Sequence, residues 1–157
     1  MRPVRLSNEQ ALQKIRHYCA YQERCHQEVK EKLYGFGLRK DEVETLISKL
    51  IEDNYLDEER FAIQYAGGKF RMKHWGKRRI EAELKNRQVS AYCIRKGLAQ
   101  IDPADYAGTL QKLAEEKYRS LAGEEPFVAR AKTMSYLLYK GYEPDLAARA
   151  VDGIVNA

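Results

Sequence analysis

The residues best suited to chemistry lie in one basic and aromatic stretch in the middle of the chain, residues 69–79, KFRMKHWGKRR. Lysine and arginine neutralise phosphates or carboxylates, and an exposed tryptophan stacks on a nucleobase. The stretch therefore predicts a surface that binds an anionic partner, either a nucleic acid or an acidic protein surface. The candidate binding residues, two of which follow the stretch, are Lys69, Arg71, Lys73, Trp75, Lys77, Arg78, Arg79, Lys85 and Arg87.

The positive charge of the chain is concentrated in this region. Residues 67–99 include ten basic and two acidic side chains, a net charge of +8, so the rest carries −3 of the total of +5. A basic centre between mildly acidic ends indicates a nucleic acid or an acidic protein surface as the partner. At helical spacing, Ile80 and Leu84 should face the core and leave Lys77, Arg78 and part of Arg79 outward. The alternative is an ordinary solvated face on which Trp75 packs as a lid.

Two other kinds of site are less well supported by the sequence. His17, Cys19, Cys25 and His26 lie close together but lack the two tight ligand pairs of a zinc site. We expect core cysteines, surface histidines, and neither a metal nor a cofactor. The sequence has no nucleophile-elbow, zinc-protease or phosphate-loop motif, so we expect no enzyme.

The composition of the chain is that of a folded protein, and its cysteines suit a reducing compartment. Hydrophobic residues make up 44% and charged residues 32% of the chain. No apolar run approaches the roughly 20 residues of a membrane span, and the first ten residues lack the apolar core of a secretory signal. The three cysteines form no disulfide framework. We expect a cytoplasmic monomer with no membrane contact.

The elements that must position the basic stretch are helices. Apolar residues recur every three or four positions almost throughout the chain, whereas no segment alternates apolar and polar residues like a strand. Ser7 is the expected N-cap of the first helix, and Asp41 that of a later helix that includes Val43. The pattern predicts an all-α protein.

One pattern of small and apolar residues occurs three times, at offsets of 51 and 53 residues. The copies are Cys25, Val29, Leu33, Leu38 and Val43; Gly76, Ile80, Leu84, Val89 and Ile94; and Ala129, Thr133, Leu137, Tyr142 and Ala147. In each, a small residue opens a helix and a short turn leads to a second helix. Gly37 and Gly141 stand in two of these turns, where glycine adopts a left-handed C-cap. Gln88 stands in the third, so we expect that turn to close differently.

A further helix precedes each pair, at about residues 8–21, 58–72 and 103–118. We therefore expect three tandem three-helix repeats, 1–54, 55–102 and 103–157, of which the second is basic. Units this small bury little apolar surface alone, so these helix-turn-helix-like repeats should pack on one another in an elongated, curved array. A helical bundle without repetition is the alternative.

The residues around the basic stretch resemble the central signature of the RecX family. The resemblance rests on residues 54–65, NYLDEERFAxxY, and residues 75–84, WGxxRIxxEL, in which x stands for any residue. It covers about residues 11–154, with a fair match in the first copy and a looser one in the third. Gln88, where the family often has glycine, and the tyrosine-rich third copy depart from the pattern.

This resemblance implies tandem three-helix repeats and a regulator of the RecA recombinase. Such proteins bind RecA and its filament on single-stranded DNA, within the filament groove. They inhibit strand exchange, ATP hydrolysis and filament growth, and some bind DNA directly. We therefore expect an inhibitor that acts in DNA recombination, DNA repair and the SOS response. The competing expectation is a stand-alone basic nucleic-acid-binding helical module, and a scaffold without DNA contact is a third.

Overall fold

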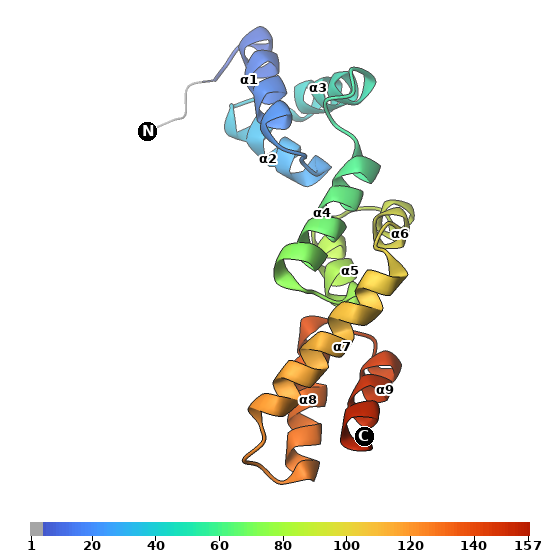
Figure 1. The fold of residues 1–157 in the computed structure, drawn as a ribbon. Helices are drawn as coiled ribbons and strands as arrows, with labels where there is room; N and C mark the ends of the chain where they lie inside the picture. The colour runs from blue at the N-terminus through green and yellow to red at the C-terminus, as the bar shows by residue number, and fades with distance from the viewer. Residues whose placement is uncertain (1–4) are drawn as a thin grey trace.

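The computed structural model describes residues 5–157, which form nine α-helices and no strand. Residues 1–4, the start of the expected first repeat, lie outside this range. Figure 1 shows the helices in successive groups of three along an elongated, curved array. The predicted all-α architecture of tandem three-helix repeats is therefore confirmed.

Each repeat contains three helices that follow one another along the chain. The first repeat comprises α1 Asn8–Tyr21, α2 His26–Gly35 and α3 Lys40–Glu52. The second comprises α4 Glu58–Lys73, α5 Lys77–Asn86 and α6 Ala91–Ala99. The third comprises α7 Pro103–Ser120, α8 Pro126–Lys140 and α9 Pro144–Val155. Within residues 5–157, no helix combines the length and the apolar character that crossing a bilayer requires.

The start of the first helix is as predicted, but that of α3 is not. The Ser7 hydroxyl accepts a hydrogen bond from the Gln10 N–H at 3.2 Å, and the Gln10 side chain accepts one from the Ser7 N–H at 3.0 Å. This capping box confirms Ser7 as the N-cap of α1. The predicted N-cap Asp41 lies inside the first turn of α3, and Arg39 is the N-cap. The Glu42 carboxylate accepts from the Arg39 N–H at 3.1 Å, which satisfies this helix start without Asp41.

The threefold sequence pattern corresponds to the interior of the molecule. All fifteen of its positions are buried. Among them, the Thr133 hydroxyl donates to the Ala129 carbonyl oxygen at 2.7 Å. Cys25 and Gly76 open α2 and α5 as their N-caps. Ala129 lies inside α8, because Pro126 starts that helix one turn earlier, in the first-turn position that proline favours.

All three turns within the repeats close in the same way, so the prediction for Gln88 is wrong. Gly37 and Gly141 have φ values of 85° and 102°, as expected, and Gln88 has 61°. The Gln88 N–H donates to the Lys85 carbonyl at 2.9 Å. The equivalent bonds of the two glycines, to the carbonyl groups of residues 34 and 138, measure 2.9 and 3.0 Å. Packing of the flanking helices therefore imposes the left-handed turn on a residue other than glycine.

The repeats enclose two hydrophobic cores. One core is built by α1, α2 and α3, and Leu56 from the following linker completes it. The other is continuous through the second and third repeats, from Phe61 to Val151. Cys25 of the first repeat packs into this second core. The basic stretch of residues 69–79 thus lies in the larger unit, where two repeats meet.

Candidate functional site

Basic and aromatic side chains alternate in a continuous series, which we call the ladder. In order, its members are Arg87, Tyr65, Lys69, Trp75, Arg79 and Tyr139. Each cation lies over one or two of the rings, so the series links α4, α5 and α8. The arrangement combines positive charge with flat ring surfaces, the two properties that bind anionic and stacking ligands.

The distances along the ladder are those of cation–π contacts. The Arg87 guanidinium carbon lies 5.1 Å from the centre of the Tyr65 ring, and Lys69 Nζ lies 5.5 Å from the same ring. Lys69 Nζ is also 5.1 Å from the Trp75 ring. The Arg79 guanidinium carbon lies 4.3 Å from Trp75 and 4.8 Å from Tyr139. All five distances are within the limit of about 6 Å for this interaction.

The helices explain why these side chains meet. Tyr65 and Lys69 are four residues apart on α4 and therefore share one face of the helix. Trp75 lies in the short connection to α5, half-buried against the larger core. Arg79 follows one turn into α5, and its guanidinium also donates to the Tyr139 carbonyl at 3.4 Å. The ladder is thus built on the framework that joins the second and third repeats.

No carboxylate of the described residues lies within ion-pair distance of the ladder cations, although Glu23 and Glu28 line the same cleft as Arg87. None of the ion pairs within residues 5–157 involves Lys69, Arg79 or Arg87. Arg87 faces a polar cleft of about 330 Å³ between the first two repeats, and its Nε is buried without a hydrogen-bond partner. At the other end, Tyr139 is 70% exposed. The ladder therefore keeps charge and one open ring available to a ligand.

The structure brings together four of the nine predicted binding residues, Lys69, Trp75, Arg79 and Arg87. Arg71 lines a different cleft, against α7. Lys85 pairs with Glu81 at 2.8 Å. The predicted set therefore covers several faces of the second repeat, of which the ladder is one.

The orientation predicted for the start of α5 holds in part. Ile80 and Leu84 are fully buried, as expected. Arg78 is exposed, as is Lys73 at the end of α4, whereas Lys77 and Arg79 are half-buried. Lys77 Nζ lies 4.9 Å from the Tyr106 ring, on the α7 side and away from the ladder.

The basic stretch also forms the junction between the second and third repeats. The Gly76 N–H donates to the Lys140 carbonyl at 2.8 Å, and the Arg78 N–H donates to the Gly141 carbonyl at 2.9 Å. The Tyr142 hydroxyl donates to the His74 carbonyl at 2.9 Å. Part of the stretch is thus structural, which its charge alone does not reveal.

A smaller hydrogen-bond network joins the second and third repeats on the α7 side of the same junction. The Tyr106 hydroxyl accepts from the Lys77 N–H at 2.9 Å and donates to the Glu143 carboxylate. Burial, together with this bond to a carboxylate, raises the pKa of Tyr106 far above its ordinary value. Tyr106 therefore stays protonated at neutral pH and keeps both bonds.

Two ladder residues, Tyr65 and Tyr139, were not among the predicted binding residues. The spacing of Tyr65 and Lys69 by four positions on an expected helix is a signal that could have identified Tyr65. Tyr139 has no comparable signal, because it reaches Arg79 only through the docking of α8 on α5.

The two cysteines of the first repeat are interior side chains. Cys19 and Cys25 are buried, as predicted, and burial raises the pKa of each thiol to about 11, so both are protonated at neutral pH. The Cys25 thiol lies 3.2 Å from a Glu28 carboxylate oxygen, to which it donates. Within residues 5–157, no group of three His, Cys, Asp or Glu side chains is placed to hold a metal ion.

Family descriptions match the second and third repeats. The domain described as "RecX, second three-helix domain" matches residues 57–98, and "RecX, third three-helix domain" matches residues 104–151. Regulatory protein RecX of Clostridium perfringens strain 13 is 32% identical over 131 residues, which are 82% of this chain and 61% of that protein. The chain thus spans about three fifths of that relative's length.

Further relatives agree in sequence and in fold. Regulatory protein RecX of Vibrio parahaemolyticus is 29% identical over 124 residues, which are 79% of this chain and 78% of that protein. The crystal structure of RecX from Lactobacillus salivarius superposes with a TM-score of 0.87 at 19% identity, covering 96% of this chain and 97% of that one. Another RecX crystal structure gives a TM-score of 0.83 at 21% identity, over 92% and 71% of the two chains. At these identities, the two structures establish the shared fold.

Proposed function

The chain belongs to the RecX family of regulatory proteins, and from this premise we propose that it binds the RecA recombinase and its filament on single-stranded DNA. Bound in the filament groove, it inhibits strand exchange, ATP hydrolysis and filament extension. It acts in DNA recombination and repair as a cytoplasmic monomer, without catalysis and without a cofactor. The residue-level resemblance of the two central runs supports this partner.

The shape of the molecule supports binding to a filament. Three repeats in one elongated, curved array present a surface much longer than that of a compact domain of the same size (Figure 1). Such a surface reaches more than one subunit of a helical filament. Several weak contacts on one rigid body then add through their high effective concentration.

The ladder is the observation that carries the proposed contact. Its three cations have no ion-pair partners in residues 5–157, and its terminal ring, Tyr139, is 70% exposed. Carboxylates of RecA or phosphates of the bound DNA would form ion pairs with these cations. The aromatic members fix the direction of the cations, so little side-chain entropy is lost on binding.

Hydrolysis of ATP by RecA on single-stranded DNA tests the proposal. Titrating this chain into preformed filaments should reduce the hydrolysis rate in a saturable way. The titration repeated without DNA reports whether the effect needs the filament. An unchanged rate at saturating protein, under conditions where the chain stays folded, would contradict the proposal.

A stand-alone nucleic-acid-binding module is the second candidate, favoured by the alternation of rings and cations in the ladder. The two functions differ in affinity at physiological salt. A RecA regulator should bind the filament at least about tenfold more tightly than bare single-stranded DNA, a difference of about 1.4 kcal/mol. A nucleic-acid module should bind both alike, and its affinity should fall steeply as salt rises.

A further inference from the structure

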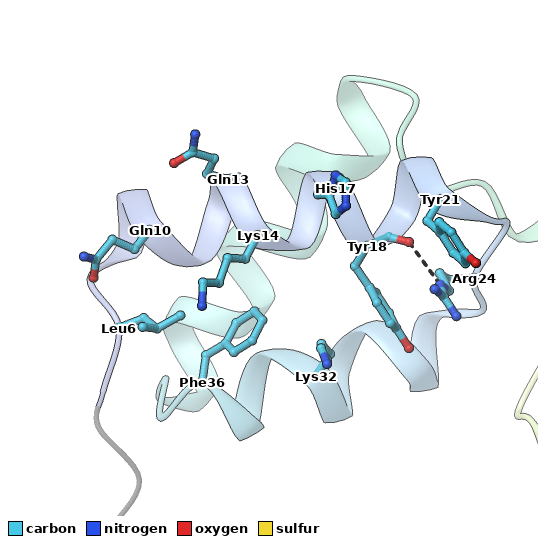
Figure 2. A pocket seen from close by; sticks show the side chains of 10 residues that line it. All are labelled: Leu6, Gln10, Gln13, Lys14, His17, Tyr18, Tyr21, Arg24, Lys32 and Phe36. Carbon is cyan, nitrogen blue, oxygen red and sulfur yellow. Dashed lines mark hydrogen bonds between the residues drawn. The ribbon is translucent and has the colours of Figure 1, made fainter.

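A second surface of cations and rings lies on the first repeat. A groove of about 840 Å³, open to solvent, runs between α1 and α2. Figure 2 shows side chains from both helices reaching into it, with Lys14, His17 and Tyr21 on the α1 side and Lys32 on the α2 side. These residues belong to none of the predicted binding sites. The groove also lies in the smaller core unit, apart from the ladder.

The groove is positively charged. It is lined by Lys14, His17, Arg24 and Lys32, and no Asp or Glu lines it. Neither lysine takes part in an ion pair within residues 5–157. Arg24 is different, because it pairs with Glu28 at 3.7 Å and its Nε donates to the Tyr18 carbonyl at 3.1 Å. Arg24 is therefore held in place within the lining of the groove, while Lys14 and Lys32 remain free to bind an anion.

Aromatic rings accompany these cations. The Tyr18 ring lies 3.7 Å from the Arg24 guanidinium carbon and 5.3 Å from Lys32 Nζ. Lys32 Nζ is also 5.9 Å from the Phe36 ring. Tyr21 is 78% exposed, so its ring contributes little to the core. The Tyr21 ring is therefore open to a stacking ligand beside the two unpaired lysines, unlike the rings of the packed tyrosines.

Helical spacing places these groups in one line. On α1, Lys14, Tyr18 and Tyr21 follow at intervals of four and three residues and so share one face. The same interval of four puts Lys32 and Phe36 side by side on the facing wall. Rings and cations thus lie on both walls of one groove, where a nucleic-acid strand could meet them with its bases and its phosphates.

We propose that the groove between α1 and α2 binds a short segment of single-stranded nucleic acid. Tyr21 and Tyr18 stack on bases, and Lys14 and Lys32 hold phosphates. An acidic peptide would engage the lysines but would leave the exposed Tyr21 ring unused. Gln10 and Gln13 also line the groove and offer amide groups to base edges. The proposal does not rest on RecA as a partner.

Fluorescence anisotropy of a fluorescein-labelled oligothymidylate of about 12 nucleotides, a length within known site sizes, tests the proposal. Tyr21→Ala and Lys32→Glu should each weaken binding about tenfold, because they remove a stacking ring and reverse a phosphate-binding charge. Tyr34→Ala and Lys30→Glu are the matched controls. These two side chains are exposed on α2 and do not line the groove, so affinity should change less than about twofold. Circular dichroism verifies that all four variants fold.

A reporter in the groove separates this site from the ladder. The chain has a single tryptophan, Trp75, so the double variant Trp75→Phe with Tyr21→Trp moves the fluorophore into the groove. The oligothymidylate should quench this fluorescence with the same affinity that anisotropy gives. Absence of quenching, or equal losses in groove variants and controls, overturns the proposal. Competition by thymidine monophosphate or polyglutamate as strong as that by the oligonucleotide would do so as well.

Discussion

At the scale of single residues, the cost of a shared backbone conformation separates Gln88 from its two repeat counterparts. Gly37 and Gly141 adopt positive φ at little cost, whereas Gln88 adopts φ of 61° with a Cβ that crowds its own backbone. The three turns nevertheless make the same hydrogen bond. At this turn the second repeat therefore stores local strain that the glycines of the other two turns avoid, and the burial of Leu84 and Val89 on either side maintains it.

Gln88→Gly should stabilise the protein by about 1 kcal/mol, because it removes the steric cost of the left-handed conformation. Thermal unfolding followed by circular dichroism measures the effect. Asn86→Gly is a suitable control, since Asn86 ends α5 in ordinary helical conformation and glycine there should destabilise. A lower melting temperature for Gln88→Gly would show that its side chain contributes more than its backbone costs.

At the scale of elements, two glycines allow the second and third repeats to dock through their backbones. A Cβ on Gly76 would overlap the carbonyl group of Gly141, and a Cβ on Gly141 would overlap Arg79. The two inter-repeat backbone hydrogen bonds, of 2.8 and 2.9 Å, depend on this close approach. The equivalent positions between the first and second repeats, Cys25 and Gln88, share no backbone hydrogen bond.

Gly76→Ala should therefore destabilise the protein by about 1–3 kcal/mol, the usual effect of adding a methyl group to a closely packed contact. Chemical unfolding at equilibrium measures it. Gly68→Ala is the matched control, since a Cβ there meets no atom within 4 Å and alanine favours the interior of α4. Equal stability of the two variants would contradict the close contact at this junction.

Sequence reasoning identified the helices better than the contacts between them. The 3.6-residue period of the apolar residues marked the first helix of each repeat, and all fifteen repeat positions are buried. The Asp41 cap was mistaken because Glu42, one position later, reaches back to Arg39. The ladder was only partly foreseen, because Tyr139 joins Arg79 across a junction that no local pattern specifies. Charge likewise did not separate Arg79, a ladder residue, from Lys77, which contacts Tyr106 at the junction.

At the scale of the whole molecule, the array divides into a small unit and a large one. The first repeat has its own core, whereas the second and third repeats share another. Contacts between the two units include the ion pair of Arg60 with Glu23, the approach of His26 to Glu58 at 3.7 Å, and the packing of Cys25 into the larger core. Local stability should follow the cores and not the repeats.

Three equivalent leucines test this division, because Leu33, Leu84 and Leu137 are all fully buried. Replacing each with alanine should cost about 2–5 kcal/mol in the unit that contains it. In hydrogen exchange, Leu137→Ala should accelerate exchange in both α4–α6 and α7–α9, whereas Leu33→Ala should do so in α1–α3 alone. Three independent responses, one per repeat, would refute the shared core.

The most direct test of the account concerns the ladder as the contact with the filament. Lys69→Gln with Arg79→Gln removes two ladder cations, and Arg71→Gln with Lys73→Gln removes two cations of the same segment outside the ladder. Within residues 5–157, the ladder variant loses four cation–π contacts of about 0.5–1 kcal/mol each and the other variant loses none, and circular dichroism verifies that both fold. The concentration that half-inhibits RecA ATP hydrolysis on single-stranded DNA should rise about tenfold for the ladder variant and less than about twofold for the other. Equal inhibition by the two variants would contradict the placement of the contact on the ladder.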